Sequence, residues 1–377
     1  MTARHRSWPG ARELAVQLTE PLPSPDDATG TREVRALAYT ALVGDPEVGD
    51  LLALNVSALA RGLGTGGYAL VVAPADPRAV PPDPPAGPGH LVKARYTPLQ
   101  ALVLGVDEQE SDHHGVLQDA DDLAGLPVVV ADLHSAVPAI VAGARYAAES
   151  AGAAPPRVAY VMTDGGALPA AFSRTVAALR ESGWLASTIT VGQAFGGDHE
   201  AVSVHSGLLA AHHVVGADLV VVAQGPGNLG TGTRWGFSGV TAGEVVNAAA
   251  TLGGRAVASL RVSGADRRDR HLGVSHHSLT AYGRVALAAA DVVVPRPDPE
   301  LQAHPAWGAG LTQRIHDQAD TLSARHRLVE RAATVQLLDV LHRCPVRLST
   351  MGRGLDADPA AFVTAAVSGQ HAYDLPV

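Results

Sequence analysis

Residues 217–223 read ADLVVVA, and residues 241–254 read TAGEVVNAAATLGG. The first stretch is short and almost wholly apolar, which is typical of a strand buried on both faces of a sheet. The second has apolar residues at helical spacing and ends in glycine, which is typical of a helix packed on that sheet. Together they predict one strand-and-helix unit of a parallel α/β sheet.

The same unit recurs on both sides of this stretch. Six apolar runs that predict strands alternate with longer segments that predict helices. The runs are PVVVADL (127–133), RVAYVMT (157–163), STITVG (187–192), ADLVVVA (217–223), RAVASLRV (255–262) and DVVVP (291–295). Buried strands joined by helices indicate a parallel sheet covered on both faces, so residues 126–295 predict a doubly wound, Rossmann-like α/β domain.

The segments before and after this domain have different patterns. Residues 12–125 contain short β-type runs without helix-length periods, which predict a small domain built on an antiparallel sheet or barrel. Residues 296–377 contain stretches such as SARHRLVERAATVQLLDVLHR (323–343), which predict a helical appendage on the α/β domain.

The composition excludes several classes of protein. Hydrophobic residues make up 46% and charged residues 17%, which indicates a folded protein rather than a disordered one. The net charge of -9 argues against binding to a nucleic-acid backbone. Cys344 is the single cysteine, which excludes an internal disulfide and any site with several cysteine ligands. No apolar stretch reaches the roughly 18 residues of a membrane span, so we expect a cytoplasmic protein, with self-association left open.

Polar residues gather in the loops that follow the predicted strands, whereas the loops that precede the strands are short and plain. Ligands of open parallel sheets bind at the carboxyl ends of the strands, where helix N-termini offer unpaired N–H groups. We therefore expect the functional site at this edge. Its polar residues are His134, Asp164, Asp198, His199, Glu200, Asn228, Arg234, Arg261, Asp266, Arg267, Arg268, His271, His276 and His277.

The most distinctive of these loops lies in LVVVAQGPGNLGTGTRWGFSG (219–239). Its first three glycines match G-x-G-x-x-G after a strand, but Arg261 stands where a nicotinamide site would need an acid. The glycines, hydroxyls and arginine favour a nest for a phosphate or carboxylate, unless the glycines only form turns and the aromatic residues only anchor the loop. The predicted ligand-binding residues are Gly225, Gly227, Asn228, Gly230, Thr231, Gly232, Thr233, Arg234, Trp235 and Arg261.

Three residues of these loops are candidates for proton transfer. His199 lies in GGDHEAV (196–202), where Asp198 is a natural helix N-cap. His276 lies in GVSHHSLTAYGR (273–284), in the first turn of a predicted helix that Ser275 caps, where an imidazole stays neutral. The candidate catalytic residues are His199, His276 and Asp164.

No pair of residues has the spacing of a known metal motif, and the sequence names no cofactor. The weak candidates for a site of mixed histidine and carboxylate ligands are His134, Asp198, His199 and His277. Glu244 is left out because Thr241 and Glu244 fit a capping box and are expected to be structural.

Several stretches resemble a family of uncharacterised actinobacterial proteins that carry a domain of unknown function. They are NVSALARGLGTGGYALVVA (55–73), GHLVKARYTPLQ (89–100), GGDHEAV (196–202), AQGPGNLGTGTRWGFSG (223–239) and GVSHHSLTAYGRVAL (273–287). The resemblance spans most of the chain. It implies no activity and no catalytic residue.

Three functions are consistent with these patterns. The first is an enzyme that acts on a small anionic ligand, phosphorylated or carboxylated and nucleotide-like, held by the glycine-rich loop and arginines. The second is a non-catalytic protein that senses such a ligand or serves as a scaffold. The third is a metal-dependent hydrolase with histidine and aspartate ligands. All three place the ligand at the carboxyl edge of the parallel sheet.

Overall fold

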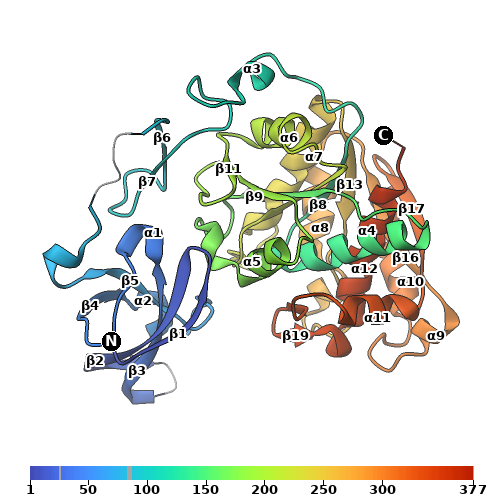
Figure 1. Ribbon diagram of the computed structural model, residues 1–377. Helices are drawn as coiled ribbons and strands as arrows, with labels where there is room; N and C mark the ends of the chain where they lie inside the picture. Colours follow the sequence, from blue (N-terminus) through green and yellow to red (C-terminus); the bar gives the residue numbers. More distant parts are fainter. Residues whose placement is uncertain (25–26, 83–86, 377) are drawn as a thin grey trace. The chain divides into compact units, whose positions relative to one another are not determined.

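The computed structural model describes residues 1–24, 27–82 and 87–376 (Figure 1). Contacts between Cα atoms divide the chain into two compact units. The smaller unit comprises Met1–Pro88 and Val92–Leu102, and the larger unit comprises Gly89–Leu91 and Val103–Val377.

A five-stranded sheet with the order β1-β2-β3-β5-β4 forms the smaller unit. Its strands are β1 (Ala3–Trp8), β2 (Ala11–Ser24), β3 (Asp27–Tyr39), β4 (Leu52–Asn55) and β5 (Ala69–Pro74). Neighbours are antiparallel except β3 and β5, which are parallel. The predicted small sheet is confirmed, but a purely antiparallel arrangement is wrong at this pair, because the chain passes through α1 (Thr40–Val43), β4 and α2 (Ser57–Ala60) before β5 begins.

From β5 to β8 along the chain, the described residues form short elements. They are η1 (Pro77–Ala79), β6 (Leu91–Lys93), β7 (Ala101–Val103) and α3 (His114–Leu117). The strands β6 and β7 pair with each other.

An eight-stranded sheet with the order β11-β10-β9-β12-β8-β13-β16-β17 forms the centre of the larger unit, and every neighbouring pair is parallel. Its strands are β8 (Pro127–Ala131), β9 (Val158–Thr163), β10 (Ser187–Thr190), β11 (His199–Glu200), β12 (Leu219–Gln224), β13 (Arg255–Ser259), β16 (Asp291–Pro297) and β17 (Arg327–Ala333). The six predicted strands are confirmed as members of one parallel sheet. Their side chains are almost fully buried, as the continuous apolar runs require.

Helices cover both faces of this sheet (Figure 1). The main ones are α4 (Val137–Ser150), α5 (Arg174–Glu181), α6 (Val204–His213), α7 (Ala242–Thr251), α8 (His276–Thr280), α9 (Pro299–Gln302), α10 (Leu311–Asp320), α11 (Gln336–His342) and α12 (Pro359–Tyr373). The helices α4, α11 and α12 contact one another, and α6, α7 and the π-helical turn η6 (Ala281–Val285) form a second group. Because crossovers between parallel strands are right-handed, the two groups lie on opposite faces.

The strand order opens a crevice near the middle of the sheet. The chain leaves β8 toward β9 on one side, whereas it leaves β12 and β13 toward the other side. Neighbouring strands therefore send their helices to opposite faces, and such switch points at the carboxyl ends of strands are where α/β proteins bind ligands.

The predicted helical appendage over residues 296–377 is only partly helical. Residues 327–333 form the strand β17, which pairs in parallel with β16 along its whole length. The segment was expected to be helical, but the free edge of β16 offers backbone hydrogen bonds that a helix would leave unused. The helices α11 and α12 follow and pack against α4, so this region completes the α/β layers.

Two predicted helix starts differ in the structure. Asp198 does not cap a helix, because His199 and Glu200 form β11 and α6 begins only at Val204, after a capping box made by Ser203 and Ser206. Thr241 makes no side-chain cap to α7, since its hydroxyl donates to the carbonyl of Ser238. By contrast, Ser275 caps α8 through the N–H of His277, as predicted. Within the described residues, no helix is long and apolar enough to cross a membrane.

Candidate functional site

An open pocket lies at the carboxyl ends of β8 and β13. Its empty space is about 490 Å³ including the mouth, and its polar lining includes Asp132, Ser259, Arg261, His271 and Arg353. A smaller space of about 200 Å³ lies at the ends of the neighbouring strands β8 and β12. Both lie at the carboxyl edge of the sheet, where the sequence places the polar loops, and next to the switch point in the strand order.

Asp132 and Ser259 are two of the buried polar residues that line the larger pocket. Ala131, the last residue of β8, pairs with Ser259, the last residue of β13, so Asp132 emerges beside this serine. Asp132 is 3% exposed and Ser259 is 2% exposed. Neither Asp132 Oδ2 nor Ser259 Oγ has a hydrogen-bond partner among the described residues. Burial raises the pKa of Asp132 to about 6, although the charge of Arg261 opposes this shift.

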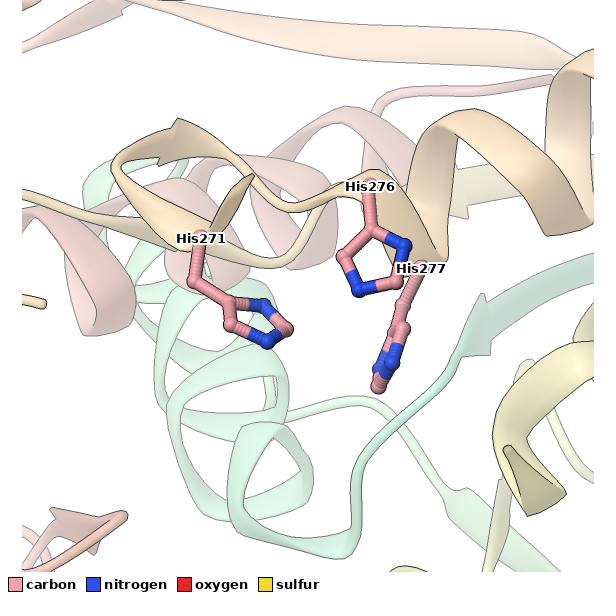
Figure 2. Close-up of side chains that lie close together, drawn as sticks. All are labelled: His271, His276 and His277. Atoms are coloured by element: carbon pink, nitrogen blue, oxygen red, sulfur yellow. The ribbon is translucent and has the colours of Figure 1, made fainter. Parts of the chain in front are cut away.

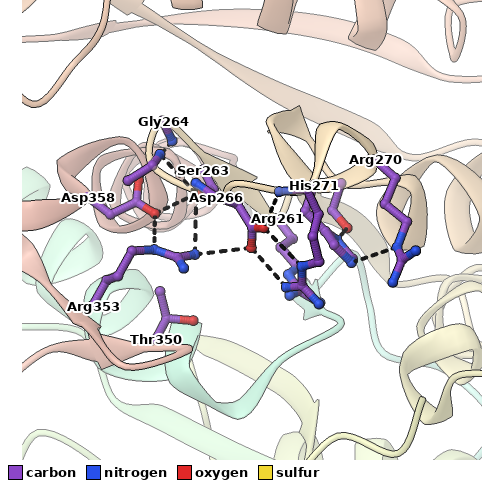
Figure 3. A network of polar contacts seen from close by, with 12 residues as sticks. Arg261, Ser263, Gly264, Asp266, Arg270, His271, Thr350, Arg353 and Asp358 are labelled. Atoms are coloured by element: carbon purple, nitrogen blue, oxygen red, sulfur yellow. Dashed lines mark hydrogen bonds and ion pairs between the residues drawn. The ribbon is translucent and has the colours of Figure 1, made fainter. Parts of the chain in front are cut away.

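A network of charged residues lies beside the pocket. Figure 3 shows the guanidinium of Arg353 between two carboxylates. Arg353 Nε donates to Asp358 at 3.0 Å, and its second nitrogen lies 3.3 Å from Asp266. Arg268 also pairs with Asp266, and this guanidinium holds the pKa of Asp266 far below its usual range. Because both carboxylates are paired, these arginines are held in place, and Arg261 is the cation whose charge acts on Asp132.

Three histidines lie close together (Figure 2), and one of them, His277, contacts Arg261. His271 comes from the turn η5 (Asp269–His271), whereas His276 and His277 begin α8. One nitrogen of each ring lies within 4.8 Å of those of the other two rings. Burial, followed by the nearby arginines, lowers the pKa of His277 to about 3 and that of His271 to about 4. All three imidazoles are therefore neutral near pH 7.

The glycine-rich loop meets the histidines through one aromatic ring. Phe237 stacks on His277 with ring centroids 3.9 Å apart. A Cβ added to Gly232 would lie 3.6 Å from the guanidinium of Arg270, so the tip of the loop lies against the arginine-rich segment after β13. Arg234 and Trp235 are exposed.

Much of this loop is bonded to itself. The N–H of Thr231 donates to the carbonyl of Gly236, the N–H of Gly236 donates to the hydroxyl of Thr233, and the hydroxyls of Thr231 and Thr233 lie 3.1 Å apart. Gly227 and Gly232 have positive φ angles, which side chains disfavour. These glycines therefore shape turns, as the alternative interpretation of the loop stated.

The first part of the loop is tied to Asp132. Gln224 donates through Nε2 to the carbonyl of Asp132 and to Asn228. A Cβ on Gly225 would lie 2.4 Å from the carbonyl of Ala167, so this glycine permits close packing on the loop after β9. Asn228 thus has a structural partner close to the smaller space, while Gly230 forms an antiparallel bridge with Phe237.

The structure does not bring His199 and His276 into one site. His199 lies on β11, five strands away from β13, which corresponds to about 24 Å at about 4.8 Å per strand. Its ring contacts His113, and the neighbouring Asp198 pairs with Arg180. Asp164 follows β9, is exposed, and accepts the N–H of Gln193.

His134 has a structural environment. Its Nδ1 lies 3.0 Å from the hydroxyl of Tyr160, and its Nε2 lies 2.7 Å from the hydroxyl of Ser173. Ser173 in turn caps α5 by accepting the N–H of Val176. Both ring nitrogens are thus engaged, which leaves none for a metal ion.

Replacing His134 with leucine should therefore lower stability by about 1–3 kcal/mol, because two hydrogen bonds in the interior are lost. Ligand and metal binding should not change. Urea denaturation measures the first effect, with the exposed His205→Leu as the control. A His134→Leu protein of unchanged stability would contradict this assignment.

Sequence reasoning missed Asp132, Ser259 and Arg353 as members of this pocket, whereas Arg261 and His271 were among the polar residues expected at this edge. Asp132 is the first residue after a buried strand, which is a general signal for a site in a parallel sheet. Arg353 lies in the hairpin of β18 (Ser349–Thr350) and β19 (Arg353–Gly354), more than eighty residues after β13 in the chain. No local pattern links it to this edge.

No curated protein and no solved structure matches the chain significantly. The model of one family, described as "Protein of unknown function (DUF3866)", matches residues 35–369 and thus reaches into both units. The resemblance expected from the sequence is therefore confirmed, and the chain belongs to this family of unknown function.

Proposed function

We propose that this protein is an enzyme that binds a small acidic molecule at the carboxyl ends of β8 and β13 and transfers a proton through Asp132. The observation that supports this most strongly is the pair of buried oxygen atoms, Asp132 Oδ2 and Ser259 Oγ, that have no partner in the described part of the chain. Buried polar atoms without partners are costly and concentrate at functional sites.

The charges around this pair fit an acidic substrate. Arg261 lies next to Asp132 without a direct bond to it, and one of its terminal nitrogens donates to His277. A guanidinium has five N–H donors, so Arg261 keeps donors for a carboxylate or phosphate. Asp132, whose pKa lies near 6, changes its protonation close to neutral pH, as a general acid or base should.

The test begins with the ligand. Thermal-shift screening with nucleotides, sugar phosphates, acyl-CoAs and small carboxylates should identify a compound that raises the melting temperature. Arg261→Gln should weaken the binding of that compound at least tenfold, because one charge-assisted interaction is lost. Arg296→Gln, at an exposed position of β16, is the matched control and should bind normally.

The outcomes separate the three functions. A ligand that is converted to product supports an enzyme, whereas a ligand that binds at Arg261 and is never converted supports a sensor. Binding that survives Arg261→Gln would move the site away from this pocket. Dependence of turnover on an added divalent ion, and its loss with a chelator, would favour the metal-dependent hydrolase, whose residues would be the three histidines of Figure 2.

A further inference from the structure

The three histidines beside Arg261 differ in how their ring nitrogens are bonded, and His277 offers a free N–H group. Its Nδ1 lies 3.0 Å from a terminal nitrogen of Arg261. Arginine only donates, so Nδ1 must accept, and the proton of the neutral ring is on Nε2. His277 therefore offers an N–H, rather than a lone pair, to anything on its far side.

His271 is engaged at both ring nitrogens. The hydroxyl of Ser275 accepts the backbone N–H of His277 and lies 2.8 Å from His271 Nδ1. Arg270 Nε donates to His271 Nε2 at 3.5 Å, at the outer limit of a hydrogen bond. Since arginine only donates, Nε2 accepts, and the proton of the neutral ring is on Nδ1, where the hydroxyl of Ser275 can accept it. His271 therefore holds Arg270 beside the group and offers no free N–H of its own.

His276 completes the group. Its Nε2 is buried and has no hydrogen-bond partner within the described ranges. Its ring lies 4.9 Å from that of His271 and 4.4 Å from that of His277 between centroids. Figure 2 shows the three rings around a common space.

The spacing of the nitrogens fits one oxygen atom. Since the three lie within 4.8 Å of one another, a single point exists that is no more than about 2.8 Å from each of them, which is a normal hydrogen-bond length. A metal ion would need a lone pair from each ring at about 2.1 Å. His277 offers an N–H group at Nε2 instead, because its Nδ1 accepts from Arg261.

The surrounding charge also favours an anion. The positive groups that act on these rings are Arg261, Arg268 and Arg270, and the negative group that acts on them is Asp266. Asp266 is already paired with Arg268 and Arg353. A divalent cation would therefore be repelled, whereas a ligand that only accepts hydrogen bonds would meet an excess of donors.

We propose that His276 and His277, with Arg261 and Arg270, bind the phosphoryl group of the substrate through one of its oxygen atoms. This proposal rests on the proposed function, and it names the substrate class as phosphorylated rather than carboxylated. The N–H of His277 and the two guanidiniums supply more donors than a carboxylate can use, and a phosphoryl group has three terminal oxygens to accept them.

Titration of the wild-type protein with inorganic phosphate, acetate and zinc chloride, followed by calorimetry, tests the proposal. Phosphate should bind one equivalent, acetate at least tenfold more weakly, and zinc not at this site. His276→Leu removes the ring and should weaken the binding of phosphate at least tenfold. His276→Gln keeps an N–H donor near the position of Nε2 and should stay within about threefold of the wild type.

His212→Leu is the matched control, because His212 and His213 form another adjacent pair, on α6, with centroids 4.5 Å apart. It should bind phosphate normally. Melting curves without ligand establish that each variant is folded. If His276→Leu does not fold, His276→Gln still tests the contribution of this position to phosphate binding.

Zinc binding that both His276 variants abolish would overturn the proposal in favour of a metal site. Phosphate binding that is equal in wild type and His276→Leu would overturn it as well. If a carboxylate ligand depends on Arg261 but not on His276, the phosphoryl proposal fails while the proposed function stands. If no acidic ligand depends on Arg261, both fail.

Discussion

Asp132→Asn is expected to stabilise the protein at pH 8 and to remove the proposed activity. Asp132 is buried, and burial raises its pKa from 3.8 to about 6. At pH 8 the folded protein holds a charge that the interior disfavours, and asparagine removes this charge without changing the shape of the side chain. A shift of about two pKa units corresponds to about 3 kcal/mol, which is the upper bound of the gain.

The sign of the pH dependence follows from the two pKa values. The carboxyl group titrates near 3.9 in the unfolded chain and near 6 in the folded protein, so the folded state holds the proton more tightly between these values. This contribution to stability is present below about pH 4 and is lost as the pH rises through 6. The advantage of Asp132→Asn should therefore be absent near pH 4 and complete above about pH 7.

Denaturation of wild type and variant at several pH values measures this difference, because other titrating groups are common to both proteins. Asp218→Asn, just before the amino end of β12 and bonded to the N–H of Arg157, is the matched control. A variant that is less stable than wild type at pH 8 would mean that Asp132 is ionised and well paired. The proposed site would then lose the observation that supports it most strongly.

Turnover should change in the opposite direction. With a substrate from the ligand screen, Asp132→Asn should be at least 100-fold slower in kcat, in line with the loss of a general acid or base. The Asp132→Asn variant should still bind the substrate, because Arg261 is unchanged. Gain of stability with loss of turnover at one position is typical of a residue kept for function rather than for folding.

The parallel sheet could be predicted because its strands are apolar at nearly every position. The strand order could not, since it depends on which edges pair in space. The order places β8 between β12 and β13, and this sets Asp132 beside Ser259. From the sequence, His134, two residues further on, was a weak metal candidate, and no local signal shows that its nitrogens bond to Tyr160 and Ser173.

The strand β17 was missed for a related reason. Its sequence, RLVERAA, has charged residues and an exposed outer side, as edge strands do, and lacks the continuous apolar pattern of the central strands. Its partner β16 determines its structure. Sequence also gave no sign that α12, the last helix, would lie directly against α4 near the pocket.

The contact between α4 and α12 is the basis of the second large effect, a loss of stability that we expect from Gly143→Ala. A Cβ on Gly143 of α4 would lie 1.9 Å from the carbonyl oxygen of Ala366 in α12, and a Cβ on Gly369 would lie 1.9 Å from that of Ile140. The obstacle is backbone on both sides, so no side chain can move aside and the two helices must separate. We expect a loss of about 3 kcal/mol or more, at the upper end of overpacking effects.

Helix propensity alone predicts the reverse, because alanine favours a helix over glycine by about 1 kcal/mol. Gly115→Ala in α3 is therefore the matched control, since its Cβ would meet nothing within 4 Å. It should be neutral or slightly stabilising. Melting temperatures of the two variants compare the two effects directly, and equal values would mean that α4 and α12 do not pack backbone to backbone.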